Sequence, residues 1–582
     1  MRIVIIGGVA GGMSAAARAR RLDEHAEIIV LEAGRYVSFA NCGLPYHLAG
    51  EIAGRDQLLL HTPESLRSRA DLDVRLGHRV TAIDRAAREL TVEVTTQDGA
   101  TSTEHLGYDA LILSPGAEAL RPPIPGLDLP MVSTLRTIPE LDSVMERTSA
   151  TLAAAAAAGR PARAVVVGAG FIGLETTEAL VHRGLSVDLV DLADHVLPPL
   201  DAELAPLLDA ELAAHGVGTH LGAGLERIEQ VGVTGSGTAG EAGTQAGAAP
   251  SARVVLSTGE VLEADLVIVS MGVRPASALA AEAGLELGAR GAIVVDAEQR
   301  TSDPHIWAVG DAVEVAFADG RRGPVLLAGP ANRQGRRAAD SVLGHPVTAQ
   351  APVLGTAIVR VFELTAAVTG ASEAVLEAAG TEHVTVRTHT GSHAGYYPGA
   401  STLHLVAHFS PEGRLLGAQV VGGEGADKRI DVLATALRAG MGAEDLAELE
   451  LAYAPPFGSA KDPVNMVGMA ALNVLTGLSP QWETRDLDEA IGTGLVLDVR
   501  GTGEWERGHL ASAMLVPLPQ LRERVEEVRE AADGRTVYVH CASGVRSYLA
   551  VRILRQEGID ARNFSGGFTS LALARPDLVV TA

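Results

Sequence analysis

Two cysteines, Cys42 and Cys541, are the only thiols in a chain of 582 residues. Cys42 lies in the string SFANCGLPYH at residues 38–47, and no second cysteine is near it. A reactive thiolate can form a mixed disulfide, a persulfide or a sulfenic acid. Because the two cysteines are about five hundred positions apart, we expect catalytic cysteines, no structural disulfide, and a reducing, cytoplasmic compartment. The competing interpretation of Cys42 is a small, inert core residue.

The turn GGVAGG at residues 7–12 has the spacing of a dinucleotide-binding loop. It follows the strand-like RIVII and opens a helix-like segment, so backbone N–H groups and the helix N-terminus can meet a pyrophosphate. An acid about 20 residues further on can bind ribose hydroxyls. Val9 replaces the middle glycine of G-x-G-x-x-G, so the match is imperfect, and a packing turn is the alternative. The predicted contacts are Gly7, Gly8, Ala10, Gly12 and Glu32.

A second turn, GAGFIGLE at residues 168–175, carries the full fingerprint through Gly168, Gly170 and Gly173. Asp191 ends the next strand-like segment and is placed to bind a ribose 2′-hydroxyl. Since an acid there repels the extra phosphate of NADPH, we favour NADH, with NADPH as the alternative.

These turns need strand–turn–helix–strand units to position them. The first occupies the N-terminal segment, and the same order returns at residues 162–191. This repetition predicts two dinucleotide-binding domains, the second inserted into the first, with a return to the first near residues 301–314. The low-complexity residues 234–252 predict a loop. Strands followed by helices from about residue 345 predict an interface domain, and a separate compact α/β unit ends the chain.

Composition narrows the class of protein. The hydrophobic content is 47% and the formal net charge is -25, which fits an α/β globular enzyme and argues against nucleic acid or an anionic membrane as the main partner. No apolar run of about 18 residues predicts a membrane span, and MRIVII runs into the glycine turn without the pattern of a signal peptide. We expect no metal site.

A third motif, TSDPHIWAVGD at residues 301–311, resembles the second flavin signature of the flavoprotein reductases with two dinucleotide-binding domains. In that family the aspartate of the Gly-Asp pair, here Gly310 and Asp311, binds the ribityl chain of FAD. The three motifs occur in the family's order over residues 1–320. The resemblance implies FAD on the first unit and NAD(P)H on the second.

The string SFANCGLPY is similar to the coenzyme A-disulfide reductases and the NADH-dependent persulfide reductases. Many reductases of the superfamily carry a C-x-x-x-x-C pair, whereas Cys42 is single. In the coenzyme A branch such a cysteine forms a mixed disulfide with coenzyme A. More distant NADH oxidases and peroxidases use it as a sulfenic acid. The residues expected to bind the coenzyme A substrate are Ser14, Arg18, Arg21, Ser38, Asn41, Asn332 and Lys461.

Two segments of the interface section, YYPGA at 396–400 and YAPPFGSAKDPVNM at 453–466, also look like this family. The resemblance implies a homodimer in which each segment places a tyrosine near the reactive sulfur of the other subunit. Tyr453 is expected in this role, and the sequence does not separate Tyr396 from Tyr397. A phenol there could donate a hydrogen bond to a leaving thiolate. Packing at the interface is the alternative.

The C-terminal segment contains DVRGTGEWERGHLASA, then TVYVHCASGVRSYLAVRILRQEGI and FSGGF, and resembles a rhodanese domain. Cys541 ends a strand-like segment and starts a loop that runs into a helix, so N–H groups and the helix dipole face the sulfur. Arg546 follows after a short C-x4-R loop that suits sulfur better than phosphate. An inactive domain is the alternative.

The expected fold class is α/β, with two Rossmann-like dinucleotide-binding domains, an α+β dimerisation domain and a rhodanese α/β domain. The predicted boundaries are 1–115 and 255–325 for FAD, 116–254 for NAD(P)H, 326–475 for dimerisation and 485–578 for the rhodanese domain. The expected activity is NADH-driven reduction of coenzyme A disulfide, persulfide or polysulfide through Cys42, with Cys541 carrying sulfur from a sulfane donor. The alternatives are an NADH oxidase or peroxidase and, more weakly, a redox sensor.

Overall fold

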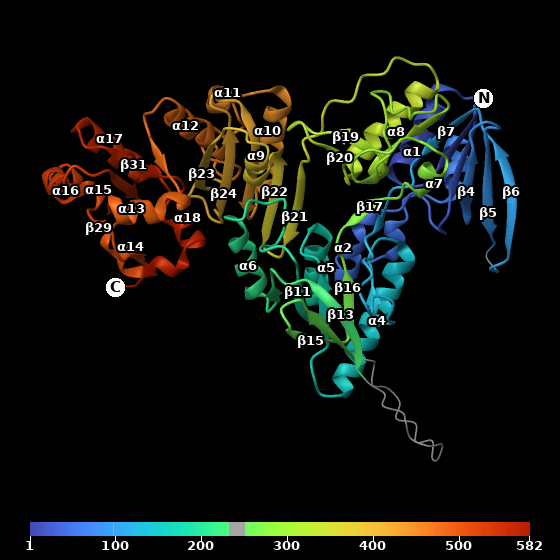
Figure 1. Ribbon diagram of the computed structural model, residues 1–582, viewed down its shortest axis with the longest axis horizontal. Helices are drawn as coiled ribbons and strands as arrows, with labels where there is room; N and C mark the ends of the chain where they lie inside the picture. The colour runs from blue at the N-terminus through green and yellow to red at the C-terminus, as the bar shows by residue number, and fades with distance from the viewer. Residues whose placement is uncertain (97, 232–250, 582) are drawn as a thin grey trace, which may run out of the picture. The chain divides into compact units, whose positions relative to one another are not determined.

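The computed structural model describes residues 1–96, 98–231 and 251–581 (Figure 1). The predicted loop at 234–252 lies almost wholly outside these residues. The chain forms two compact units, one of Met1–Asp194 with Gly216–Val353, the other of His195–His215 with Leu354–Ala582. No helix in the described ranges has the length and apolar character that crossing a membrane requires.

A five-stranded parallel sheet in the first unit positions the first glycine turn, and its strand order is β18-β7-β1-β2-β3. Ile3, Val4 and Ile5 of β1 are fully buried, as is typical of parallel strands covered on both faces. The late strand β18 pairs with β7 and confirms the predicted return to this sheet. The elements are β1 (Arg2–Ile6), α1 (Ala10–Leu22), β2 (Glu27–Glu32), β3 (Asp73–Leu76), β7 (Ala110–Leu113), β18 (Ile306–Ala308) and α8 (Ala328–Val342).

A second five-stranded parallel sheet, β12-β11-β10-β16-β9, is inserted between β7 and β18. It repeats the strand–turn–helix–strand order, as the sequence predicts. Its elements are β9 (Val132–Ser133), α4 (Ile138–Ala157), β10 (Arg163–Val167), α5 (Phe171–His182), β11 (Ser186–Val190), β12 (Gly218–His220) and β16 (Leu266–Val269). The unit also contains two three-stranded antiparallel sheets: β4 (His78–Asp84), β5 (Glu89–Thr95) and β6 (Thr101–Gly107), then β13 (Leu225–Val231), β14 (Ser251–Leu256) and β15 (Val261–Ala264).

The second unit begins with a five-stranded antiparallel sheet of order β21-β22-β25-β24-β23. Its elements are β21 (Ala357–Val361), β22 (Leu364–Gly370), α9 (Glu373–Ala378), β23 (Val384–Gly391), β24 (Thr402–Phe409), β25 (Leu415–Gly422), α10 (Ala426–Ala439), α11 (Ala443–Glu448) and α12 (Pro463–Leu475). Leu403, Leu405 and Phe409 alternate along β24 into a core that α10 and α12 share. This α+β arrangement is the one expected for the interface domain.

The short segment His195–His215, which contains α6 (Ala205–Ala214), belongs to the second unit although it lies between β11 and β12 in the chain. Buried His408 of β24 shares a 2.9 Å hydrogen bond with Asp201 and a 3.0 Å hydrogen bond with Thr385. The hydrogen bond from His408 lowers the pKa of Asp201 against the opposing effect of burial, so the carboxylate stays charged. This buried group therefore anchors the segment.

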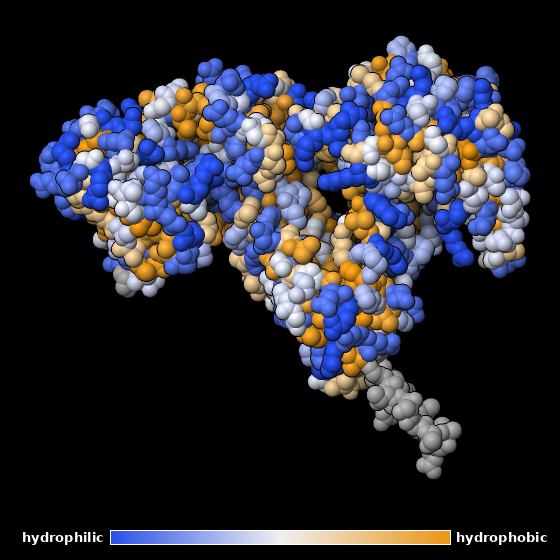
Figure 2. Space-filling view, viewed as in Figure 1, coloured by the Kyte–Doolittle hydropathy of each residue, from blue (hydrophilic) through white to orange (hydrophobic). Residues whose placement is uncertain are grey.

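The C-terminal module of the second unit has a five-stranded parallel sheet of order β26-β31-β30-β27-β29 around the buried Trp482. Its elements are β26 (Gln481–Trp482), α13 (Leu487–Thr493), β27 (Leu495–Asp498), α14 (Thr502–Arg507), β29 (Met514–Leu515), α16 (Val525–Ala532), β30 (Val537–His540), α17 (Val545–Gln556), β31 (Ala561–Phe564) and α18 (Gly567–Ala574). Hydrophilic residues cover most of the face shown in Figure 2, and hydrophobic residues form smaller groups between them.

Candidate functional site

The first glycine turn is a cradle that leaves no space for side chains. Gly7 has φ 98°, and a Cβ there would lie 2.0 Å from the carbonyl oxygen of Ser114. A Cβ at Gly12 would lie 1.9 Å from the carbonyl oxygen of Gly7. The carboxylate of Glu32 accepts hydrogen bonds from the N–H groups of Gly8 (2.8 Å) and Gly34 (2.7 Å). The glycines therefore leave the backbone before and at the start of α1 without side chains, as close approach of a pyrophosphate requires.

The second turn repeats this geometry. The Asp191 carboxylate accepts hydrogen bonds from the N–H groups of Ala169 and Ala193, which correspond to Gly8 and Gly34. A Cβ at Gly173 would lie 1.7 Å from the Gly168 carbonyl oxygen, so the fold itself requires that glycine.

Gly170 differs from the other glycines of the second turn. A Cβ there would meet no atom of the described residues within 4 Å, and its φ of -80° is open to any residue. Neither crowding nor backbone geometry explains this glycine, whereas a ligand that approaches the backbone does. Both turns fit dinucleotides.

Cys42 lies in the short 3-10 turn Asn41–Gly43, directly before α2 (Leu44–Ala49). The residue is exposed, and its N–H donates to Oδ1 of Asn41 at 3.1 Å. Its sulfur is nevertheless enclosed enough that burial raises the pKa of the thiol, and the carboxylates of Glu175 and Asp311 raise this pKa further. The thiol of Cys42 is therefore close to the Gly-Asp pair that the sequence analysis assigned to FAD.

Ser38 connects the first glycine turn to the cysteine segment. It has φ 48°, in the left-handed region that a non-glycine residue seldom adopts, and its N–H donates to the Gly8 carbonyl at 2.7 Å. Its own carbonyl accepts from Leu60 at 3.0 Å. Such a conformation persists only where surrounding contacts hold it, which is common at functional sites.

Two residues beside Cys42 were not found from the sequence. The hydroxyl of Tyr46 in α2 donates to Oε1 of Glu175 in α5 at 2.9 Å. Glu175 is the last residue of the GAGFIGLE string, but nothing local indicates that it reaches across to the cysteine segment. Only the packing of α2 against α5 brings the two together.

The residues predicted to bind coenzyme A on α1 and α8 are close together. These helices touch where a Cβ at Gly335 would lie 2.2 Å from the Gly11 carbonyl oxygen. Ser14 donates to Oδ1 of Asn332 at 2.7 Å. Arg18 is already paired with Asp340 at 2.7 Å, whereas Arg21 is exposed. Arg20 is buried, donates to backbone carbonyls, which include that of Glu24 at 2.7 Å, and is 3.9 Å from the Asp71 carboxylate.

Two exposed arginines of α8, Arg333 and Arg336, were missed by the sequence analysis. They follow Asn332 on the helix that packs against α1. Only that helix contact identifies them as neighbours of the predicted residues.

The tyrosines predicted from the second unit separate into two groups. The hydroxyls of Tyr396 and Tyr453 are 3.0 Å apart and both side chains are exposed, and their hydrogen bond raises the pKa of Tyr396. Tyr397 instead has its ring against His393, with ring centroids 5.5 Å apart. The structure therefore selects Tyr396 as the partner of Tyr453. Lys461 is exposed in the same segment.

Cys541 is buried at the end of β30, in the loop that leads to α17. The Gly544 N–H donates to its Sγ at 3.2 Å, and the Ser547 hydroxyl donates to it at 3.3 Å. Arg546 makes a two-pronged ion pair with Glu504, at 2.7 and 2.6 Å. This pair lowers the pKa of Glu504 to about 2, so the arginine stays anchored at any working pH. Two hydrogen-bond donors, from Gly544 and Ser547, therefore face the sulfur of Cys541.

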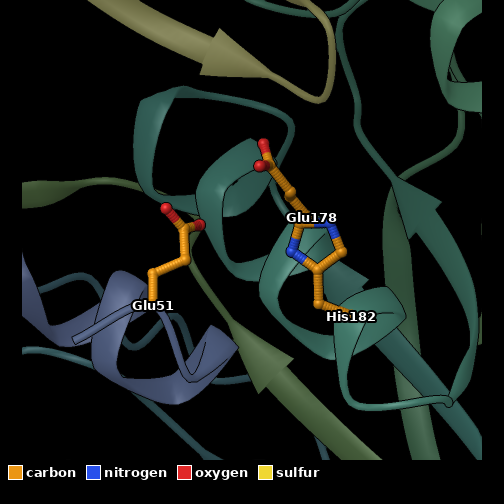
Figure 3. A group of neighbouring side chains, drawn as sticks. All are labelled: Glu51, Glu178 and His182. Carbon is orange, nitrogen blue, oxygen red and sulfur yellow. The ribbon is translucent and has the colours of Figure 1, made fainter. Parts of the chain in front are cut away.

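A group near the contact between α2 and α5 contains possible metal ligands. Figure 3 shows Glu51, Glu178 and His182, whose ligand atoms lie within 4.8 Å of one another. Glu178 and His182 are one helical turn apart in α5. Each of the three side chains also has other interactions, so the group is explained without an ion, and we assign it no metal.

Comparisons with known proteins agree with this geometry. A family model described as pyridine nucleotide-disulphide oxidoreductase matches residues 1–335, and the dimerisation domain of that family matches residues 356–463. A rhodanese-like domain model matches residues 483–574.

Three individual proteins are similar over most of the chain. A coenzyme A disulfide reductase of Staphylococcus aureus is 33% identical over 478 residues, which cover 81% of this chain and 99% of that protein. The crystal structure of reduced Bacillus anthracis CoADR-RHD has 39% identity and a TM-score of 0.90, covering 100% of this chain and 99% of that one. An NAD-dependent persulfide reductase from A. fulgidus has 35% identity and a TM-score of 0.86, covering 98% and 100%. These findings confirm the predicted fold class and the resemblance.

Proposed function

Because the chain belongs to the pyridine nucleotide-disulphide oxidoreductase family, we propose that it reduces coenzyme A disulfide, persulfide or polysulfide with NADH, through FAD and Cys42. One observation supports this most strongly. Cys42 is exposed beside the predicted flavin signature, while the only other cysteine is buried in a separate loop of the other unit. The second sulfur of a disulfide therefore has to arrive on the substrate.

The residues present fit both cofactors. The first glycine turn with Glu32 and Asp311 would hold FAD, and the second turn with Asp191 would hold NADH, which keeps NADPH as the less favoured donor. Bound FAD supplies two-electron transfer between NADH and sulfur. The chain contributes the cradles, the neighbouring thiol and the carboxylates that set its protonation.

The thiolate of Cys42 attacks the sulfur of CoA–S–S–R that is bonded to coenzyme A. An S–S bond forms between Cys42 and coenzyme A, and RS⁻ leaves. Two electrons from NADH and one proton then regenerate the Cys42 thiolate and release coenzyme A as the thiol. For coenzyme A persulfide the leaving group is HS⁻.

The coenzyme A moiety would lie along α1 and α8. Ser14 and Asn332 are neighbours there, and exposed Arg21, Arg333 and Arg336 are free to meet phosphates as planar donors. Arg18 has its charge already compensated by Asp340, so we assign it a weaker role. Ser38 and Asn41 would flank the pantetheine arm, and Lys461 would come from the dimerisation domain.

We infer a homodimer from the match to the dimerisation domain. In it the hydroxyl pair of Tyr396 and Tyr453 would serve the cysteine of the other subunit by donating to the departing thiolate. Two free cysteines favour a reducing, cytoplasmic location.

Cys541 would take sulfur from a sulfane donor. With thiosulfate, the Cys541 thiolate attacks the outer sulfur, sulfite leaves, and Cys541 becomes a persulfide. Cyanide or another thiolate then attacks the outer sulfur of this persulfide and releases the Cys541 thiolate. Gly544, Ser547 and the anchored Arg546 would stabilise the negative charge.

The test of the reductase is NADH consumption by the holoenzyme with coenzyme A disulfide, coenzyme A persulfide, polysulfide, hydrogen peroxide and air. We expect the sulfur substrates to be turned over fastest, and Cys42→Ser to lose at least about 10³-fold in kcat/KM with them, as expected when a nucleophile is removed. The Cys541→Ser variant is the matched control and should keep this activity. Faster turnover of peroxide or oxygen, or full sulfur activity in Cys42→Ser, would overturn the proposal.

A further inference from the structure

The sulfur loop, residues 541–544, packs against the turn that contains FSGGF, residues 564–568. The N–H of Phe568 donates to the Cys541 carbonyl at 2.6 Å. The N–H and the hydroxyl of Thr569 donate to the Ala542 carbonyl at 3.0 and 2.9 Å. The carbonyl groups of Cys541 and Ala542 therefore both accept hydrogen bonds from this turn.

The held carbonyls determine where the N–H groups of the loop point. In a planar trans peptide the C=O and the next N–H point in opposite directions. When the carbonyls of Cys541 and Ala542 are directed toward the turn, the N–H groups of Ala542 and Ser543 are directed away from it. Oriented donors are what stabilises a negatively charged sulfur. The turn thus fixes the direction of two peptide groups in the loop between Cys541 and Gly544, whose own N–H donates to Sγ at 3.2 Å.

The turn itself is tightly enclosed. Gly567 has φ 66°, and a Cβ there would lie 2.7 Å from the Cys541 and Ala542 carbonyl oxygens. Gly566 has φ 79°, and a Cβ there would lie 2.1 Å from Oγ of Ser570 and 3.1 Å from Cβ of Arg387. Gly567 therefore packs against the loop of Cys541. Gly566 packs against Ser570 and against Arg387, which lies on a strand outside the rhodanese-like segment.

That strand is β23 of the antiparallel sheet, and it supplies a specific hydrogen bond. Nε2 of His389 is 2.8 Å from Oγ of Ser570, the residue that packs on Gly566. Nδ1 of His389 is enclosed and has no hydrogen-bond partner among the described residues. Burial and the neighbouring His404 and Arg387 lower the pKa of His389 to about 3, so the ring stays neutral.

We propose that His389, a residue of the dimerisation-domain sheet, is a positioning residue for sulfur transfer at Cys541. Through Ser570 it fixes the Gly566–Gly567 turn, which in turn holds the carbonyls of the sulfur loop. The loop is then best ordered for sulfur transfer while this hydrogen bond from β23 is in place. This inference rests on the proposed sulfurtransferase activity of Cys541 and adds a residue from outside its module.

The experiment compares His389→Ala, His389→Asn and His389→Gln in the full-length holoenzyme. A glutamine amide reaches the place of Nε2, whereas an asparagine amide reaches only the place of Nδ1. With thiosulfate and cyanide, we expect kcat to fall about fivefold in the Ala and Asn variants with KM for thiosulfate unchanged, as for one lost neutral hydrogen bond. The Gln variant should restore kcat. Ser570→Ala should behave as His389→Ala.

A second readout does not depend on activity. Hydrogen exchange of the amides at residues 542–544 should be faster in the Ala and Asn variants and normal in the Gln variant. Normal kcat and exchange in His389→Ala and Ser570→Ala would overturn the inference alone. Equal loss in all three His389 variants would overturn it as well, since it would indicate general destabilisation. A wild-type chain with no sulfurtransferase activity would overturn the proposed function with it.

Discussion

At the scale of single residues, the surroundings of Cys42 disfavour the thiolate. Burial is the largest cause of the raised pKa of the Cys42 thiol, and the carboxylates of Glu175 and Asp311 raise this pKa further. Since each of these effects raises the pKa of the thiol, the reactive form is scarce at neutral pH and grows as the pH rises. In the described surroundings the Cys42 thiol is therefore mainly protonated at neutral pH.

The charge of Glu175 gives a test of this balance. In Glu175→Gln the hydrogen-bond acceptor for Tyr46 is kept and the negative charge is lost, so the pKa of Cys42 should fall. Iodoacetamide should then alkylate Cys42 faster at pH 7 to 8, and the pH profile should move to lower pH. A Cys541→Ser background confines the label to Cys42.

Tyr46→Phe is the matched control, because it removes the hydrogen bond and leaves the charge. It should not accelerate alkylation. An unchanged profile in Glu175→Gln would show that the carboxylate has no effect on the thiol.

At the scale of elements, the second glycine turn separates glycines needed by the fold from one needed by a ligand. A Cβ at Gly173 would lie 1.7 Å from a backbone oxygen, whereas one at Gly170 would have no atom within 4 Å in the part of the chain that the structure describes. We expect Gly170→Ala to leave Tm unchanged and to raise KM for NADH roughly tenfold, which corresponds to about 1.4 kcal/mol of binding.

Gly173→Ala should lower Tm or prevent folding, because the backbone around it cannot yield. Thermal unfolding and NADH kinetics of the two variants provide the measurement. If Gly170→Ala binds NADH normally, the dinucleotide does not approach this backbone.

The elements also show what the sequence could and could not predict. The β1–α1–β2 and β10–α5–β11 units follow from hydrophobic runs and glycine spacing within about 30 residues, and both were predicted. The pairing of Tyr46 with Glu175 depends on packing between α2 and α5, which no local pattern reveals. For the same reason the hydrogen bond of Tyr453 with Tyr396, and not with Tyr397, could not be predicted, since adjacent residues of a loop have no regular direction.

At the scale of the whole chain, Arg387 is the centre of a charged junction inside the second unit. Its guanidinium pairs with Glu203 at 2.5 Å, Glu483 at 3.2 Å and Glu373 at 3.9 Å. These acids come from the His195–His215 segment, from the start of the rhodanese-like segment and from α9. The arginine side chain is only 8% exposed. Three separate parts of the chain therefore meet on one buried cation.

Loss of that cation should release the module. Arg387→Ala leaves mostly buried carboxylates without their partner, which costs about 3–5 kcal/mol of unfolding free energy. Denaturant unfolding should show this loss, and limited proteolysis should cut faster between residues 475 and 485.

Arg485→Ala serves as the control, because Arg485 also pairs with Glu483, at 2.7 Å, but is 58% exposed. Its loss should cost under about 1 kcal/mol. Equal stability of the two variants would contradict a structural role for the junction.

The hydrogen bond between Asp201 and His408 limits the positions at which this chain can be divided into separately encoded parts. The chain passes between its two units after Asp194, after His215 and after Val353, so a short piece of the second unit lies within the sequence of the first. A gene fragment ending after Val353 would encode Asp201 without His408 and Thr385, and would expose a carboxylate that the intact protein buries. A chain divided at that point therefore loses a buried hydrogen bond that the intact chain has. The rhodanese-like segment is continuous, so a single recombination event can add it or remove it.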